Sequence, residues 1–325
     1  MNSPDSVFEK MNIMGSRGVP FLFMIDFACL EPIAIPLNEA AEQGILFDVR
    51  GIINYDSEPT SNMKALIFEK FPVDFAQYRK AFEIAMESLR FGNSYLLNLT
   101  FATPVRINRS LKEIFMLSKA PYRILSDDRF VVFSPECFIR IAGNTIRSFP
   151  MKGTIDAGLH DASNILLSDR KEMAEHNTIV DLIRNDLSMV SSAVRVERFR
   201  YLEEIKTNQK HLLQASSEIA GKLTSDWPSK IGTILQTLLP AGSISGAPKT
   251  MTIDIIKKAE PIKRGFYTGV FGIFDGETLD SAVMIRYIKQ EGEDLFFHSG
   301  GGITINSNAG SEYNEMIDKV YVPFV

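Results

Sequence analysis

Short apolar runs alternate with polar turns along most of the chain. The runs at residues 19–25, 45–49 and 65–68 are bounded by Gly, Pro, Asn or Asp, which predicts strands separated by turns. Residues 129–133 and 137–141 predict two paired strands around Ser134-Pro135-Glu136. Further strands are predicted at residues 94–105, 269–274, 281–289, 295–299 and 302–305.

Helical spacing of apolar residues is clearest over residues 75–91, where Gly92 gives a C-terminal stop signal. Other helices are predicted at 110–117, from 169 to about 187, at 230–239, at 248–259, and from a Ser311 cap onward. The first 15 or so residues are polar and rich in Met, and we expect them to be loosely held.

The mixture of strand clusters and helices indicates the fold class. The elements do not alternate strictly as strand and helix, which favours an α+β protein with mostly antiparallel sheets. A chain of 325 residues can form two domains or one large unit. We expect residues 1–74 to form a short N-terminal segment whose strands complete the fold.

Charge and cysteine content exclude several classes of protein. The formal net charge is −5, from 35 Lys and Arg against 40 Asp and Glu, so no basic excess favours nucleic-acid binding. Two cysteines cannot form a disulfide framework, which fits a reducing cytoplasm. The apolar stretch at 19–30 is shorter than the roughly 20 residues of a membrane span, and no basic segment precedes it. We therefore expect a cytoplasmic protein that does not enter a membrane.

Two pairs of glutamates could form a metal site. Glu172 and Glu175, and likewise Glu312 and Glu315, are three residues apart and share a helix face. Each pair alone has a simpler interpretation: Glu172 can complete a capping box with Asp169, and the second pair can oppose a helix dipole. If the pairs face each other, their oxygens would suit Mg²⁺.

A lysine in a tight turn is a candidate nucleophile. Lys152 lies in Pro150-Met-Lys-Gly-Thr154, and an amine attacks only when it is uncharged. From a reference pKa of about 10.4, making half of it neutral at pH 7 requires roughly 4.6 kcal/mol, which burial or nearby cations can supply. The alternative is an ordinary surface-loop lysine.

Glycine-rich segments and one arginine could bind anions. The segments span residues 240–249, 265–269 and 300–302, and none matches a P-loop or a GxGxxG loop. Each of them alone could simply be a turn between strands. Arg286 could bind a carboxylate through two hydrogen bonds, or form an ordinary surface salt bridge.

Taken together, these segments resemble the chorismate-utilising enzymes, and within that family the aminodeoxychorismate synthases (component I). The resemblance extends over about residues 75–325 and follows the order of the family's motifs. It rests on Ser134-Pro-Glu136, Pro150-Met-Lys-Gly-Thr154, Glu172-Met-Ala-Glu-His176 with its continuation to 187, and the segments 240–249, 264–269, 285–286, 300–303 and 312–315.

The resemblance implies one compact α+β fold of stacked, mostly antiparallel sheets with helices outside, and makes residues 75–325 a chorismate-binding catalytic domain. It implies Mg²⁺ held by Glu172, Glu175, Glu312 and Glu315, with a carboxylate of chorismate completing the site. It gives Lys152 the role of nucleophile and Glu136 that of general acid/base. The implied substrate-binding residues are Asn98, Thr154, Tyr267, Arg286, Gly300, Gly301, Gly302 and Lys319.

The implied activity joins chorismate and ammonia to give 4-amino-4-deoxychorismate through a covalent Lys152 intermediate, for 4-aminobenzoate and folate biosynthesis. Ammonia would come from a separate glutamine amidotransferase subunit. Leu96 departs from the branch, which usually has glutamine there, while isochorismate synthases have a lysine. Anthranilate synthases typically carry alanine at position 152.

Three alternatives remain beside this interpretation: an anthranilate synthase component I, a non-catalytic scaffold within the family, and Schiff-base chemistry at Lys152. The leading residues contain no recognisable tryptophan-binding motif, so we expect no tryptophan feedback.

Overall fold

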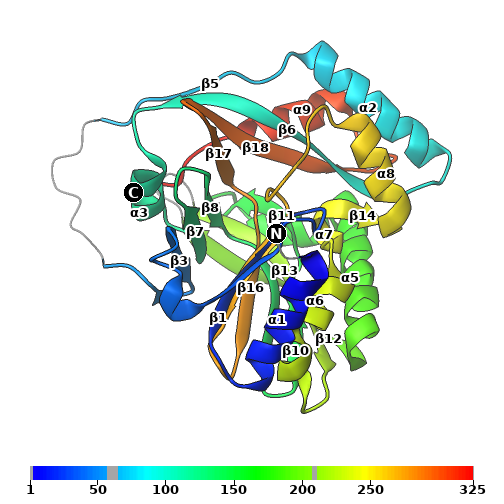
Figure 1. Cartoon of the computed structure of the whole chain (residues 1–325). Helices are drawn as coiled ribbons and strands as arrows, with labels where there is room; N and C mark the ends of the chain where they lie inside the picture. The colour runs from blue at the N-terminus through cyan, green and yellow to red at the C-terminus, as the bar shows by residue number, and fades with distance from the viewer. Residues whose placement is uncertain (1–2, 57–64, 207–210, 325) are drawn as a thin grey trace.

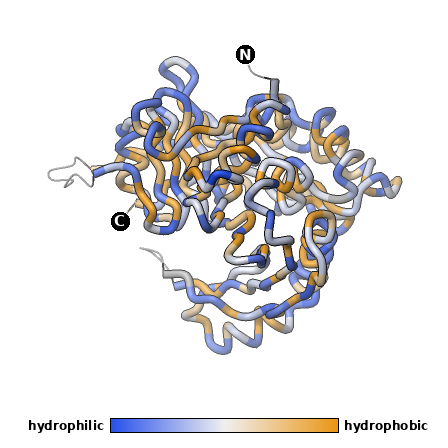
Figure 2. The backbone as a smooth tube through the Cα atoms, turned by 60° about the horizontal axis from the view of Figure 1, so that its bottom comes forward, coloured by the Kyte–Doolittle hydropathy of each residue, from blue (hydrophilic) through white to orange (hydrophobic). Residues whose placement is uncertain are grey.

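The computed structural model describes residues 3–56, 65–206 and 211–324. Within these ranges, the strands form two sheets of nine strands each, and all the strand pairings are antiparallel. Hydrophobic and hydrophilic residues alternate at short intervals along the chain (Figure 2), although strands such as β1, β8 and β15 are buried at every position. Helices cover the outer faces, so the predicted α+β class with stacked antiparallel sheets is confirmed (Figure 1).

The first sheet contains the N-terminal strands and the long central hairpin. Its order is β11 (Met151–Asp156), β13 (His211–Lys222), β10 (Thr145–Ser148), β9 (Cys137–Ala142), β16 (Leu279–Val283), β15 (Val270–Phe274), β1 (Phe21–Ile25) and β2 (Ile33–Pro36), with β12 (Ser192–Lys206) paired to β13.

The second sheet is built around the long strand β6. Its order is β14 (Gly246–Ala247), β6 (Leu96–Ile107), β18 (Asp294–Ile303), β17 (Tyr287–Glu291), β8 (Phe130–Ser134), β7 (Tyr122–Ser126), β3 (Ile45–Val49) and β4 (Ile52–Ile53), with β5 (Phe68–Lys70) paired to β6.

Helices and short 3-10 turns connect and cover these strands. They are α1 (Pro4–Ser16), η1 (Leu37–Glu39), α2 (Phe75–Arg90), α3 (Leu111–Leu117), α4 (Ala162–Ser168), α5 (Arg170–Val190), η2 (Trp227–Lys230), α6 (Ile231–Leu238), α7 (Gly242–Ser245), α8 (Lys249–Ala259) and α9 (Ala309–Asp318). Their starts follow the expected capping chemistry: Asp74, Ser110 and Asp169 each accept hydrogen bonds from the first helical turn. The last helix is capped by Asn308 and not by the predicted Ser311.

Buried side chains fill three layers. One cluster lies between the sheets and includes Leu22 of β1, Phe47 of β3 and Phe271 of β15. A second fills the space between the first sheet and α1, α5 and α6. A third lies under α2, α8 and α9, which cover β6 and β18 (Figure 1), and a fourth lies under α3, which packs on β7 and β8 of the same sheet. The stacking of two sheets with helices on both outer faces follows from these apolar faces.

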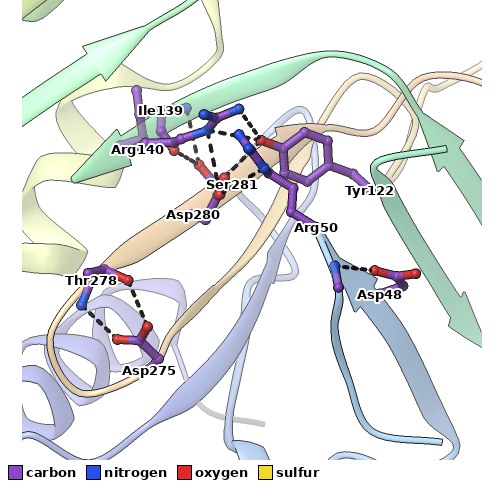
Figure 3. A network of polar contacts seen from close by, with 10 residues as sticks. Asp48, Arg50, Tyr122, Ile139, Arg140, Asp275, Thr278, Asp280 and Ser281 are labelled. Atoms are coloured by element: carbon purple, nitrogen blue, oxygen red, sulfur yellow. Dashed lines mark hydrogen bonds and ion pairs between the residues drawn. The ribbon is translucent and has the colours of Figure 1, made fainter. Parts of the chain in front are cut away.

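A polar network also joins the two sheets. Asp280 of β16 accepts a hydrogen bond of 2.9 Å from the hydroxyl of Tyr122 on β7, in the other sheet. The Asp280 carboxylate also lies 3.5 Å from Nε of Arg140 and 3.9 Å from Nε of Arg50 (Figure 3). These contacts fix β16 against β7 at one edge of the interface between the sheets.

The N-terminal residues differ from their prediction. Residues 4–16 form helix α1, which begins at Pro4 after a Ser3 cap and packs on η2 and α6. Its Phe8, Met11 and Met14 are buried, so the Met-rich composition marks a packed face and not a loose segment. Residues 1–2 and 57–64 of the expected 1–74 segment lie outside the described residues.

The strands predicted at 129–133 and 137–141 are confirmed as β8 and β9, but the predicted pairing between them is wrong. Strand β8 pairs with β7 and β17 in the second sheet, whereas β9 pairs with β10 and β16 in the first. The chain therefore crosses between the sheets at Ser134-Pro135-Glu136. The predicted single strand at 281–289 is likewise two strands, β16 and β17, which belong to different sheets.

These two crossings lie side by side. The N–H of Val283 donates to the carbonyl of Glu136 at 3.1 Å, and the N–H of Phe133 donates to the carbonyl of Arg286 at 3.1 Å. Arg286 has a positive φ of 53°, a left-handed backbone conformation that a regular strand excludes. In contrast, the two strands predicted at 295–299 and 302–305 are one continuous strand, β18.

Candidate active site

A cleft of about 900 Å³ opens where the two sheets part at the crossings. Every residue that the sequence proposed for the site lines it, from segments far apart in the chain. They are Asn98, Glu136, Lys152, Thr154, Glu172, Glu175, Tyr267, Arg286, Gly300, Gly301, Gly302, Glu312, Glu315 and Lys319. A cleft of this size accommodates a small organic ligand.

Lys152 lies on β11 and points toward helix α5. Its Nζ is 2.9 Å from Oε2 of Glu175, and about a third of its side chain is exposed (31%). The neighbouring Gly153 has a φ of +85°, and a Cβ there would come within 3.1 Å of Oε2 of Glu172. Glycine therefore allows both the turn of the strand and the close approach of α5.

The charge of Lys152 differs from the expected neutral amine. Burial lowers the pKa of Lys152, but Glu175, Glu315 and Glu172 outweigh it, so the pKa is raised. The carboxylates, and not cations, surround this amine. In this arrangement Lys152 is an ammonium ion, and it must lose a proton before it can attack an electrophile.

Glu136 stands at the first crossing, where the charges of Lys319 and Lys152 act on its carboxyl group. Burial raises the pKa of Glu136, although a hydrogen bond from Ser243 and the charges of Lys319 and Lys152 oppose the rise. The Ser243 hydroxyl donates to Oε1 of Glu136 at 2.9 Å. A buried carboxyl with a raised pKa can hold a proton and deliver it, which is the property that a general acid needs.

The four other glutamates come from α5 and α9, as the matching spacings predicted. Asp169 caps α5, accepting from the N–H groups of Lys171 and Glu172 at 2.8 and 3.0 Å. The side chain of Glu172 lines the cleft. A Cβ on Gly301 would lie 3.5 Å from Oε2 of Glu312 and 3.7 Å from Oε1 of Glu315, so both carboxylates lie beside the backbone of β18.

The electrostatics of these carboxylates is that of a negative site balanced by lysines. Burial and the neighbouring Glu175 raise the pKa of Glu172, and burial raises that of Glu312. Burial acts to raise the pKa of Glu315, but the Lys319 ammonium, 2.7 Å away, outweighs this effect and the pKa is lowered. Glu175 is shared between Lys152 and, at 3.9 Å, Lys171.

The donor chemistry of this set suits a hard divalent cation, since every side-chain donor is a carboxylate oxygen. As the side chains stand, however, no three His, Cys, Asp or Glu residues in the described ranges are placed to hold a metal ion. Mg²⁺ could be held by these residues only if some of them turned away from their lysine partners.

Other residues that line the cleft offer groups for anions. Arg286 donates through Nη1 to the carbonyl of Lys319 at 2.6 Å, and its Cζ lies 4.5 Å from the centroid of the Tyr321 ring. These two contacts fix its guanidinium. Lys319 Nζ donates to the carbonyl of Gly300 at 2.9 Å. Tyr267 is 4% exposed, and burial raises the pKa of its phenol, so it remains a hydrogen-bond donor.

Asn98 offers an acceptor inside the cleft. Its side-chain oxygen is buried and has no hydrogen-bond partner in the structure, so a ligand N–H or O–H could bind there. Thr154 lies at the mouth, on β11 opposite Gln214. Leu96, 9% exposed, also lines the cleft and gives that wall an apolar surface.

Sequence reasoning missed three residues of this site. Ser243 was included only as part of a glycine-rich segment, and its hydrogen bond to Glu136 is a contact between distant segments. Lys171 precedes Glu172 and reads in the sequence as a solvated charge. His298, 4% exposed between Tyr267 and Tyr287, lines the cleft; burial lowers its pKa to about 3, so it is neutral. Its position on strand β18, two residues before Gly300, was the available signal.

Comparisons with known proteins agree with this site. The chorismate binding enzyme family matches residues 35–324. An uncharacterized PabA-like protein of Haemophilus influenzae is 53% identical over 315 residues, which cover 97% of this chain and 95% of the relative.

In the ranges that the structure describes, no helix is long and apolar enough to cross a membrane.

More distant relatives carry names for two activities. Aminodeoxychorismate synthase component 1 of Bacillus subtilis is 30% identical over 259 residues, 75% of this chain and 54% of the relative. Anthranilate synthase component 1 of Pseudomonas putida is 32% identical over 252 residues, 74% of this chain and 49% of the relative. The chain thus spans about half the length of these two enzymes.

Solved structures support the fold. The menaquinone-specific isochorismate synthase MenF of Escherichia coli superposes with a TM-score of 0.74 over 98% of this chain and 81% of its own, at 16% identity. That level of identity supports the fold alone. Because the family match covers most of the chain and includes the motifs that line the cleft, the protein belongs to the chorismate binding enzymes.

Proposed function

We propose that the protein is the synthase subunit of an aminodeoxychorismate synthase, converting chorismate and ammonia to 4-amino-4-deoxychorismate and water. The observation that carries the proposal is that Lys152 and Glu136 line the same cleft as the four carboxylates and Arg286. The relative from Bacillus subtilis that bears this activity in its name gives independent support.

In the proposed reaction, Arg286, Tyr267 and Lys319 bind one carboxylate of the substrate, with Asn98, Thr154 and the Gly300–Gly302 backbone beside them. Glu172, Glu175, Glu312 and Glu315 would hold Mg²⁺, which supplies positive charge for the other carboxylate. Lys319 is paired with Glu315, so it links the two groups of residues.

The covalent step begins once Lys152 leaves its 2.9 Å contact with Glu175, which frees that carboxylate for the metal, and the ammonium passes a proton to water in the cleft. The free amine then bonds to C2 of the ring, the double bonds shift, and the C4–O bond breaks. Glu136 gives its proton to the departing hydroxyl, which leaves as water. Ammonia then bonds to C4 and passes a proton to Glu136, the double bonds shift back, and the C2–N bond to Lys152 breaks. The released amine takes up a proton from water, which regenerates the lysine.

Partners and setting follow from the same proposal. The ammonia would come from a separate glutamine amidotransferase subunit, and the product would serve 4-aminobenzoate and folate synthesis in the cytoplasm. A second candidate is anthranilate synthase component I, favoured by the relatives that bear this name. A scaffold without catalytic activity is the third, and Leu96, which departs from the glutamine usual in both synthase branches, motivates it.

Product identification tests the proposal. Purified protein is incubated with chorismate, Mg²⁺ and ammonium, with and without an aminodeoxychorismate lyase, and products are separated by chromatography. We expect 4-aminobenzoate only when the lyase is present. Anthranilate would move the assignment to the second candidate, and no Mg²⁺-dependent consumption of chorismate would favour the scaffold.

The lysine provides the sharper variant. Lys152→Ala should abolish amination at C4 and could reveal some anthranilate formation, because anthranilate synthases resemble the variant at this position. Lys112→Ala, an exposed residue of α3, is the matched control and should behave as the wild type. Undiminished aminodeoxychorismate formation by Lys152→Ala would rule out the covalent route.

A further inference from the structure

A serine from a separate element holds the carboxyl group of Glu136. The hydroxyl of Ser243 on α7 donates to Oε1 of Glu136 at 2.9 Å, and both residues line the cleft. The two residues are 107 positions apart in the sequence, so the bond joins α7 to the sheet crossing. With Oε1 engaged by Ser243, the other oxygen of Glu136 is the one left for a proton.

Helix α7 is a fixed support and not a mobile loop. A Cβ on Gly242 would come within 2.0 Å of Cδ2 of Leu182, so α7 lies directly against α5. The backbone N–H of Gly242 donates to the carboxylate of Asp186, which is itself paired with Lys249 at 2.9 Å. The Asp186 carboxylate is largely buried, and its contacts with Gly242 and Lys249 tie α7 to α5 and α8. These contacts fix the position of Ser243.

The C-terminal half of the single-turn helix α7 is also held in place. Nη1 of Arg264 donates to the carbonyl of Ile244 at 3.0 Å, and that arginine is 5% exposed. On the partner side, the backbone of Glu136 is held by Val283 and by the Ser134 hydroxyl, which accepts from the Glu136 N–H at 3.1 Å. The Ser243–Glu136 bond therefore connects two anchored backbones.

A small cavity beside Glu136 and Ser243 gives the carboxyl group room to turn if their hydrogen bond is lost. This cavity of about 20 Å³, enough for one water molecule, is lined by Glu136, Ser243, Ser148 and Asp186 on the side toward α5. Without the Ser243 hydroxyl, the carboxyl could turn into this space and away from the cleft. A rotation of this kind would separate an acid from the oxygen that it must protonate.

We propose that Ser243 is a positioning residue that keeps the carboxyl group of Glu136 directed into the cleft, so that its second oxygen delivers the proton to the departing hydroxyl. The chemistry in this inference rests on the proposed function. The hydrogen bond between Ser243 and Glu136 does not, and its effect can be measured in the unreacted protein.

The expected effect on acidity follows from the same contact. The hydrogen bond from Ser243 stabilises the ionised carboxyl and so opposes the rise in the pKa of Glu136 that burial causes. The other titratable groups around it are Lys152, Lys319, Tyr267 and Cys137, and Ser243→Ala leaves all of them in place. The variant should therefore raise the pKa of Glu136 further.

The kinetic test compares Ser243→Ala with Ser243→Thr, which keeps a hydroxyl, and with Ser188→Ala, an exposed serine of α5. We expect Ser243→Ala to lower kcat by about 10- to 100-fold, a part of what a general acid contributes, with little change in KM for chorismate. The basic limb of its kcat pH profile should move to higher pH. Ser243→Thr should restore both kcat and the position of the basic limb. If Ser243→Ala keeps the kcat and the basic limb of the wild type, the inference is overturned.

A second measurement needs no turnover. The infrared carboxyl band of Glu136 is assigned by subtracting the spectrum of Glu136→Gln, and its titration is followed in the substrate-free protein. We expect a higher midpoint in Ser243→Ala than in the wild type and in Ser188→Ala. An unchanged midpoint would overturn the role of Ser243, whereas a shifted midpoint in a protein that makes no aminodeoxychorismate would overturn the proposed function alone.

Discussion

Replacing Arg264 with methionine should destabilise the fold far more than breaking an exposed ion pair of the same spacing. Arg264 and Glu260 are four residues apart and each side chain is 3% exposed. All five N–H donors of the guanidinium are used: Glu260 accepts two hydrogen bonds, and the others go to the carbonyls of Asn98 and Ile244 and the hydroxyl of Thr268.

The magnitude follows from what remains after the substitution. Methionine fills much of the space, but the carboxylate of Glu260 stays buried, stabilised only by the N–H and hydroxyl of Thr100, each at 2.9 Å. Removing one partner of a buried pair in this way costs about 3–5 kcal/mol. The carbonyls of Asn98 and Ile244 also lose their donor, and both residues line the cleft.

Urea unfolding followed by circular dichroism measures the free energy of unfolding. Arg79→Met is the matched control, since Arg79 and Glu83 are also four residues apart but 62% and 61% exposed, where such a pair contributes about 0.3–0.5 kcal/mol. The double variant Glu260→Gln with Arg264→Met should recover part of the loss because it removes the buried charge. Equal losses in Arg264→Met and Arg79→Met would refute this reasoning.

Other predictions test burial, packing and metal binding. Burial lowers the pKa of His298 from 6.5 to about 3, so the fold excludes a proton that the unfolded chain accepts; stability should fall as pH drops below 6.5, by up to about 1.4 kcal/mol per pH unit more in the wild type than in His298→Phe. A flat difference between the two proteins in acid urea titrations would contradict this. Gly232→Ala would place a Cβ 2.0 Å from the carbonyl oxygen of Phe8, so it should lose about 1–3 kcal/mol and speed proteolysis within residues 4–16, unlike Gly158→Ala on an exposed turn. Glu172→Gln should weaken Mg²⁺ binding in calorimetry without lowering the melting temperature of the metal-free protein, since it removes a carboxylate that burial and Glu175 disfavour; the exposed Glu83→Gln should change neither.

Local patterns were sufficient for elements whose burial is regular. The helix α2 has buried Tyr78, Phe82 and Leu89 on one face, and its predicted stop at Gly92 matches a residue with φ +76°. Helix α1 was missed because its face uses methionines, although Ser3 and Pro4 gave the start signal of a helix. The hairpin of β12 and β13 was missed because β12 carries many charged residues and lacks a continuous apolar run.

In the candidate site, the residues could be predicted from the sequence, but their contacts with one another could not. The residues that the resemblance implied all line the cleft, whereas spacing alone placed only the two glutamate pairs on their helix faces. The pairing of Lys152 with Glu175 and the resulting charge of the lysine could not be predicted, because the partners come from different elements. The same reason applies to Ser243 and Glu136, whose contact depends on how α7 packs against α5.

The position of the cleft has a cause that apolar patterns conceal. Both crossings continue from a buried strand of one sheet to a buried strand of the other, so each looks in sequence like a single strand or a simple strand pair. At the crossings the backbone leaves one ladder before it joins the next, and two main-chain hydrogen bonds, from Val283 to Glu136 and from Phe133 to Arg286, connect the passing segments. The carboxyl of Glu136 and the guanidinium of Arg286 are thus placed by the main chain, at the seam where the sheets diverge and leave room for a ligand.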